Sequence, residues 1–166
     1  MSTSHDLGLQ LLQASESADG AGVNCLLAHG ANPNFVDGEG RSALFFSSKA
    51  GNSEMAGALI RAGAKVNVAT RLSVTPLKAA AGGGHIDVVR LLIKSGANLN
   101  AVSRTGTTAL MLAAANGHID VVRLLLDCGA RRDLQTRCKG SRHPSRTAAS
   151  WAAERGHREL AKLLLG

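Results

Sequence analysis

The nine-residue stretch GHIDVVRLL occurs twice in the chain, at Gly84–Leu92 and again, one 33-residue period later, at Gly117–Leu125. Gly-Ala pairs repeat with the same spacing, at positions 30–31, 63–64, 96–97 and 129–130. A later Gly-His pair, Gly156–His157, falls six positions beyond where the period would place it, so the last unit carries a six-residue insertion. A fixed period of this size predicts a stacked array, because one unit cannot bury its own apolar face.

The residues within one period predict two short helices and a loop. Thr75 is expected to cap a first helix that has Pro76 in its first turn, and Gly82–Gly84 are expected to end it. Residues 86–94 are expected to form a second helix with a broad apolar face. Residues 98–107 are turn-rich and predict an extended finger that leads to the next unit.

A 33-residue unit of two helices that opens with Thr-Pro-Leu and closes with Gly-Ala resembles the ankyrin repeat. The resemblance covers residues 7–166 and implies an all-α solenoid of stacked helix-turn-helix units joined by hairpin-like finger loops. The single domain, 1–166, would contain five units near 5–36, 37–69, 70–102, 103–135 and 136–166, the first and last acting as caps. The histidine usual after Thr-Pro-Leu is replaced by Phe45, Lys78, Met111 and Ser150, which predicts the loss of a hydrogen bond between loop and helix.

The composition favours a folded intracellular protein. Hydrophobic residues make up 45% of the chain and charged residues 19%, which argues against disorder. No apolar run reaches the length of a transmembrane helix, and the first residues lack the basic start of a secretion signal. Three cysteines do not suggest a disulfide framework. We expect a monomer in a reducing compartment, cytoplasmic and/or nuclear.

Positive charge is concentrated at the C-terminal end. Residues 1–130 contain 10 basic and 9 acidic residues (net +1), and residues 131–166 contain 9 and 3 (net +6). Residues 131–146, here called the basic arm, predict an exposed loop that serves solubility, binds an acidic protein, nucleic acid or anionic membrane surface, or signals nuclear import. Nucleic acid is disfavoured because Trp151 is the one nearby aromatic residue for base stacking. The arm cations proposed to act are Arg131, Arg132, Arg137, Lys139 and Arg142.

The resemblance also implies where a partner would bind, on the concave face formed by finger tips and the exposed ends of first helices. Leu72 and Val74 are apolar at positions where the repeat does not require an apolar residue. They lie between arginines, which is the pattern of a protein-binding centre with a charged rim. Drift at unconstrained positions explains the same residues. Through the 33-residue register, the expected binding residues are Arg41, Lys49, Arg71, Leu72, Val74, Arg104, Thr105, Thr107, Asn116, Arg146 and Arg155.

The predicted function is therefore a non-catalytic protein–protein interaction module, a scaffold, adaptor or inhibitor with an acidic protein as partner. Two alternatives stay open. One is polyanion binding through the basic arm, and the other is a structural module cut from a larger protein.

The sequence shows no catalytic or metal-binding pattern. Cys128, Cys138, His143 and His157 occur late in the chain but lack the paired spacing of zinc ligands. No nucleophile elbow, phosphate-binding loop or dinucleotide fingerprint is present. We expect no enzyme activity, cofactor or metal. Cys25 aligns with Leu91 and Leu124 and is expected in the core.

Three asparagines, Asn34, Asn67 and Asn100, fall at equivalent finger positions. The resemblance implies that asparagines at this position are candidates for hydroxylation. A structural role is the alternative, because Asn suits turns and can bond to its own backbone.

Overall fold

The computed structural model describes residues 4–136 and 145–166, which form helices joined by loops, with one isolated β-bridge between Val36 and Ser42. The first helices of the units are α1 (Ser4–Glu16), α3 (Ala43–Ala50), α5 (Pro76–Gly83), α7 (Ala109–Ala115) and α9 (Ala148–Glu154). The second helices are α2 (Gly20–Ala28), α4 (Ser53–Arg61), α6 (Ile86–Lys94), α8 (Ile119–Asp127) and α10 (Arg158–Leu165).

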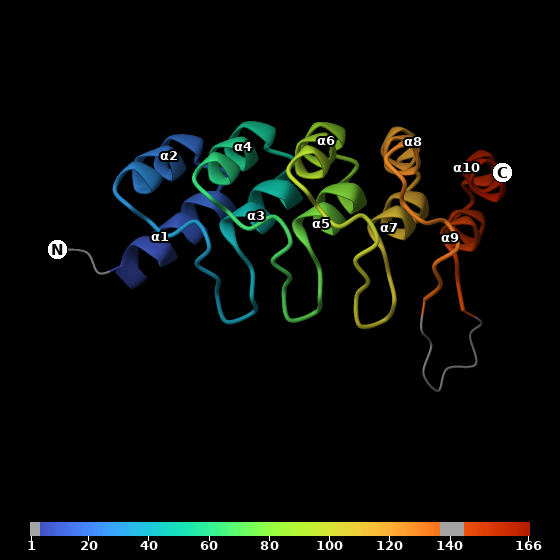
Figure 1. The fold of residues 1–166 in the computed structure, drawn as a ribbon, viewed down its shortest axis with the longest axis horizontal. Helices are drawn as coiled ribbons and strands as arrows, with labels where there is room; N and C mark the ends of the chain where they lie inside the picture. Colours follow the sequence, from blue (N-terminus) through green and yellow to red (C-terminus); the bar gives the residue numbers. More distant parts are fainter. Residues whose placement is uncertain (1–3, 137–144) are drawn as a thin grey trace.

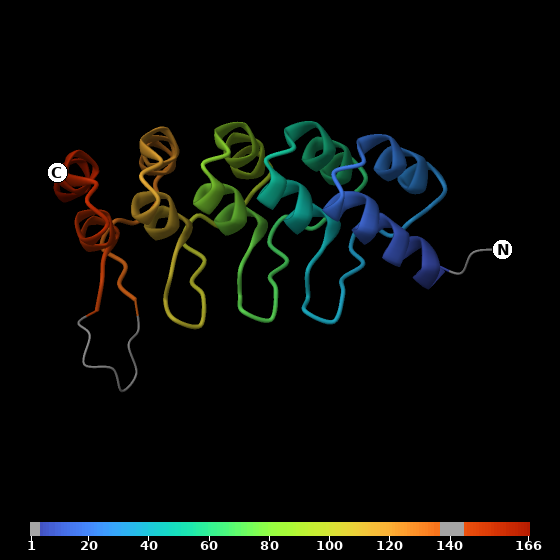
Figure 2. The same cartoon turned by 180° about the vertical axis from the view of Figure 1, so that it is seen from behind.

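The helices form two layers (Figures 1 and 2). The first helices lie side by side from α1 to α9, the second helices form the other layer, and the fingers project from the first-helix layer on the side away from the second helices. The two ends of the chain lie at opposite ends of this array. The predicted all-α solenoid is confirmed.

Side-chain caps start most of the first helices. The side-chain oxygens of Ser42, Thr75, Thr108 and Thr147 each accept a hydrogen bond from the backbone N–H three residues later, as N-caps do. The prediction that all three glycines at 82–84 end α5 is wrong, because the helix runs through Gly83 and ends at Gly84 with φ +75°. Only the last glycine supplies the left-handed residue that terminates the helix.

Small residues let the layers pack closely. Ala80 and Ala81 of α5 and Ala113 and Ala114 of α7 are fully buried. The second helices supply the larger aliphatic side chains, such as Val88, Val89 and Leu92 of α6 and their counterparts in α8. The core is therefore one continuous layer between the two rows of helices rather than a separate core in each unit.

The two ends of the array differ from its middle. Cys25 is exposed, so its expected place in the core is wrong. Its counterpart Leu91 lies near Gly57 of the preceding unit, and the described chain places no helix on that side of α2. At the other end, Arg158 and Leu165 of α10 are both exposed, Leu165 by 79%.

Hydrogen bonds at the same repeat position join neighbouring units. The ring nitrogen Nε2 of His85 lies 3.0 Å from the carbonyl oxygen of Lys49, and Nε2 of His118 lies 3.0 Å from the carbonyl oxygen of Gly82. Each histidine therefore ties the start of a second helix to the end of the preceding unit's first helix. This contact explains why the sequence repeats histidine at this position.

Candidate partner-binding site

One side chain at the base of each finger closes it. Asp37 Oδ1 accepts hydrogen bonds from the N–H groups of Glu39 and Arg41, at 2.9 and 2.8 Å. Burial alone would raise the pKa of Asp37, but the hydrogen bonds from Arg41 and Glu39 outweigh it and lower that pKa below its ordinary value. At the equivalent positions of the next two fingers, Ser103 accepts both corresponding backbone bonds, and Thr70 accepts one of them, from the N–H of Val74.

Sequence reasoning missed this finger-closing position. The signal was present, because the 33-residue register places Asp, Thr and Ser there, and these side chains bond to nearby backbone in turns. In the fourth finger the same role falls to Thr136, which exchanges two hydrogen bonds with Arg146 at 2.9 and 3.0 Å. The insertion therefore lies between these two residues.

The most exposed apolar group of the fingers is the Leu72 ridge, defined as Leu72 and Val74. Leu72 is 67% exposed and Val74 is partly buried. A cavity lies on each side of the ridge. The Lys78 cavity, about 310 Å³, is lined by Leu72, Val74, Lys78, Ser103, Arg104, Thr105, Thr107 and Leu112. The Arg41 cavity, about 270 Å³, is lined by Glu39, Arg41, Phe45, Thr70, Leu72 and Val74.

The two cavities bring together part of the predicted binding face. Six of its residues line one cavity or both: Arg41, Leu72, Val74, Arg104, Thr105 and Thr107. Lys49, Asn116 and Arg155 lie at the ends of first helices and line neither. Asn116 has a structural bond, since its Nδ2 donates to the carbonyl oxygen of Gly82 at 2.7 Å.

Lys78 is the residue that sequence reasoning misjudged. Its side chain is only 2% exposed, and its Nζ donates to the backbone carbonyl of Ser73 at 2.8 Å. Burial lowers the pKa of Lys78 from 10.5 to about 8. The expected loss of a loop-to-helix hydrogen bond is therefore wrong here. At Ser150 the hydroxyl exchanges hydrogen bonds with the backbone of Thr147, the N-cap of α9, and so completes a capping box.

Several cations of the binding face already have acidic partners. Arg41 Nε lies 2.6 Å from Asp37, and Arg41 also lies over the ring of Phe46. Arg71 lies 3.5 Å from Glu39 across two neighbouring fingers. These carboxylates neutralise part of the face, so the arginines do not form a free basic stripe.

The remaining cations of the face differ among themselves. Arg146 lies 3.0 Å from Glu154, so it too is paired. Among the ion pairs of residues 4–136 and 145–166, none involves Arg104, Lys49 or Arg155. Of these three cations, which have no ion pair in the described chain, Arg104 is the one that lines a cavity.

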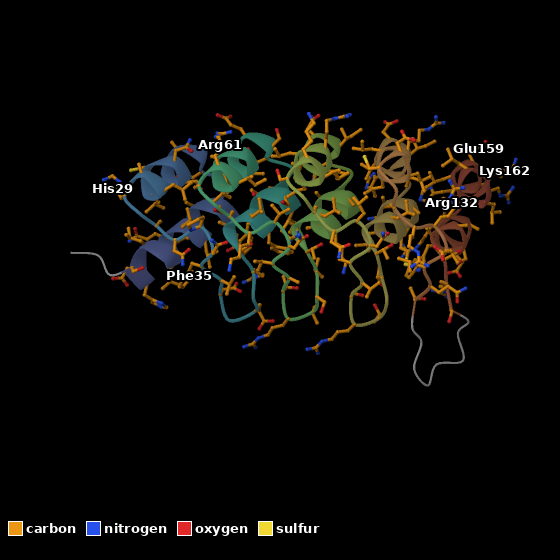
Figure 3. All side chains as sticks on the ribbon, viewed as in Figure 1. His29, Phe35, Arg61, Arg132, Glu159 and Lys162 are labelled. Atoms are coloured by element: carbon orange, nitrogen blue, oxygen red, sulfur yellow. The ribbon has the colours of Figure 1, made fainter. Side chains whose placement is uncertain are left out.

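Other charged side chains lie away from the fingers. Figure 3 shows Arg61 on the second-helix layer and Glu159 with Lys162 on α10. In the basic arm, Arg131 forms an ion pair with Asp133 at 2.6 Å, and Arg132 lies near Gly166 at the end of α10. The other arm residues, Arg137, Lys139 and Arg142, lie outside the described residues, as do Cys138 and His143. No three potential metal ligands gather among the residues that are described.

The finger asparagines bond to the next unit rather than to their own turn. Asn34 donates through Nδ2 to the carbonyl of Gly63 and accepts the N–H of Lys65 through Oδ1, at 3.0 and 2.7 Å. Asn67 repeats both bonds one unit later, and Asn100 Oδ1 accepts the N–H of Arg131. These bonds give the asparagines a structural role; their hydroxylation stays a prediction.

The chain belongs to the ankyrin-repeat family. The profile of the family described as ankyrin repeats (3 copies) matches residues 11–103 and 98–166. Ankyrin repeats are generally protein–protein interaction modules and are typically non-catalytic. No curated protein is significantly similar in sequence. Within the part of the chain that the structure describes, no helix has the length and apolar character needed to cross a membrane.

Proposed function

We propose that the chain is a non-catalytic protein-binding module whose partner docks on the Leu72 ridge and its two flanking cavities. The observation that carries the proposal is the exposure of Leu72, at 67%, between two hollows lined by both apolar and basic residues. A single exposed leucine is ordinary on a protein surface, but a leucine set between two concavities also offers shape complementarity.

The rest of the binding face would form the rim of this interface. Arg104 lies in the wall of one cavity without an acidic partner in the described chain, and it would steer an acidic protein toward the ridge. Lys49, Arg71, Asn116, Arg146 and Arg155 would contribute at greater distance. Because the stacked units hold the backbone of these residues in fixed positions, little backbone entropy is lost on docking. The proposed role is that of a scaffold, adaptor or inhibitor, and we propose further that the protein is a monomer located in the cytoplasm and/or nucleus.

The test is capture of partners from a nuclease-treated lysate with three baits: the intact chain, Leu72→Ser and Leu165→Ser. Leu165 is a matched control because it is exposed and apolar but lies at the far end of the array. Both substitutions remove an exposed leucine, so circular dichroism of the three baits should agree.

A protein retained by the intact chain and by Leu165→Ser, but weakened about tenfold or more by Leu72→Ser, would support the proposal. Equal retention by both variants would contradict it. Binding that falls steeply with salt and survives Leu72→Ser would instead favour the basic arm.

A further inference from the structure

The Lys78 cavity combines a buried ammonium group with a wall that lacks acidic residues. Lys78 Nζ donates to Ser73, and no ion pair within residues 4–136 and 145–166 involves Lys78. Among the described residues, the lining contains two cations, Lys78 and Arg104, and no Asp or Glu. Buried charges in proteins are normally paired, so this cavity lacks the counter-charge that such a site favours.

The hydroxyl groups of the next finger add a donor to the same cavity. Ser103 Oγ accepts two backbone N–H bonds, which occupies both of its lone pairs, so its own proton is free to go to Thr105 Oγ1 at 2.9 Å. Thr105 Oγ1 lies 3.0 Å from Thr107 Oγ1, and either hydroxyl can donate in this contact. When Thr105 donates, the proton of Thr107, which lines the cavity, is available to a ligand.

The remaining wall is apolar and restricts what can enter. Leu72, Val74 and Leu112 line the cavity, whose volume of about 310 Å³ lies at the lower end of ligand pockets. A bare inorganic anion would leave this apolar surface uncovered. A carboxylate carried on a short aliphatic stem, beside an apolar neighbour, matches both the donors and the apolar wall.

We propose that the Lys78 cavity is a subsite for a Glu or Asp side chain of the partner, with a neighbouring apolar side chain of the same segment packing on the Leu72 ridge. The inference rests on the proposed function and adds the chemistry of the partner to it. The carboxylate would accept hydrogen bonds from Lys78 Nζ and the Thr107 hydroxyl, with Arg104 at the mouth of the cavity.

Of the described charged residues in and around α5, Lys78 and Arg104 line this cavity. The helices that pack against α5 are α3, α6 and α7, and the flanking fingers complete its surroundings. The charged and titratable residues on these elements are Lys49, His85, Asp87, Arg90, Lys94, Asp37, Glu39, Arg41, Arg71 and Arg104. Of these, Arg104 alone shares the cavity with Lys78, and desolvation alone accounts for the lowered pKa of Lys78.

The experiment selects displayed random peptides on the intact chain and discards those that also bind Leu72→Ser. The acidic residues of each retained peptide are replaced by Gln or Asn, and affinities are measured against the intact chain, Lys78→Met and Lys94→Met. Met replaces the buried lysine stem with an apolar chain of similar length. Lys94 is the control because it is an exposed lysine of α6 that lines neither cavity and is not part of the predicted binding face. Thr107→Val provides a second variant that leaves Lys78 in place.

We expect one carboxylate in each peptide to be required. Its loss and Lys78→Met should each weaken binding about tenfold or more, with no further loss when they are combined. Thr107→Val should weaken binding less, and Lys94→Met should have little effect. In a chain with ¹³C-labelled lysines, the peptide should raise the pKa of Lys78 above about 8.

Leu72-dependent peptides without an acidic requirement, or equal losses in Lys78→Met and Lys94→Met, would overturn this inference and leave the proposed function standing. Recovery of no peptide that depends on Leu72 would count against both. A peptide whose acidic residue is required but shows no coupling to Lys78 would place the carboxylate outside the cavity and would also overturn the subsite.

Discussion

Gly84, the left-handed residue that ends α5, lies against the imidazole ring of His118 in the following unit. A side-chain carbon at Gly84 would come within 2.5 Å of Nδ1 of that ring, and the backbone there has φ +75°. The relationship recurs one unit earlier, at Gly51 and His85. Glycine is therefore required at this position for two separate reasons, its backbone conformation and the ring that covers it.

The three consecutive glycines of α5 should consequently respond differently to alanine. Gly84→Ala is expected to destabilise the array by about 2 kcal/mol or more, because it combines a left-handed alanine with a steric clash. Gly82→Ala should stabilise by about 0.5–1 kcal/mol, because Gly82 is helical and a carbon added there meets Leu112 at an ordinary 3.7 Å. Urea denaturation followed by circular dichroism measures both effects. Destabilisation by Gly82→Ala would show that close packing around α5 outweighs the higher helix propensity of alanine.

Ser73 occupies the finger position at which Gly40 and Gly106 stand in neighbouring units, and it adopts the same left-handed conformation, with φ +59°. Ser73→Gly should raise the free energy of unfolding by about 0.5–1 kcal/mol, because relief of backbone strain exceeds the added entropy of the unfolded chain. The control is Ser73→Ala, which keeps a side chain at positive φ and should give no gain. Equal stabilisation by Ala would assign the effect to the hydroxyl rather than to the backbone.

Asn67 should stabilise the junction between two units. Asn67→Ala removes one donor and one acceptor that face Gly96 and Asn98, and we expect a loss of about 1–3 kcal/mol. Asn24→Ala is the control, because Asn24 is an exposed helical asparagine. Hydrogen exchange of the Asn98 amide gives a local measurement, since that N–H donates to Asn67 Oδ1. Unchanged protection of this amide in Asn67→Ala would contradict the assigned role.

The repeating period was enough to predict the architecture, because a period reports contacts that recur in every unit. Thr75 and Pro76 open α5 as the sequence indicates, and the repeated histidines fill the same place in successive units. These residues contact near neighbours in the chain or the equivalent residues of the adjacent unit, so spacing alone locates them.

Features that occur once could not be predicted in the same way. Burial of Lys78 depends on the carbonyl of Ser73 being turned toward it, and the pairing of Arg71 depends on Glu39 in a different finger. Both contacts join positions that the repeat leaves variable. Sequence reasoning therefore singled out Leu72, which is exposed, but it did not foresee that acidic residues pair with the arginines near it.

Lys78 should make the stability of the chain depend on pH in a direction opposite to that of a paired lysine. Its pKa is about 8 in the folded chain, against an ordinary value of 10.5. Below pH 8 the amine is charged in both states, and burial of that charge disfavours folding. Between pH 8 and pH 10.5 the unfolded chain binds more protons, so the free energy of unfolding rises with pH across this window.

The measurement is the difference in free energy of unfolding between the intact chain and Lys78→Met, determined at several pH values from 7 to 10.5. The difference cancels titration of the other lysines and should shift in favour of the intact chain by about 1–3 kcal/mol as pH rises. Lys49→Met, at an exposed lysine, is the control for the loss of a lysine elsewhere in the chain. A flat difference for Lys78→Met would mean that the ammonium is solvated in the folded chain. The cavity would then hold no buried charge for a partner carboxylate to neutralise.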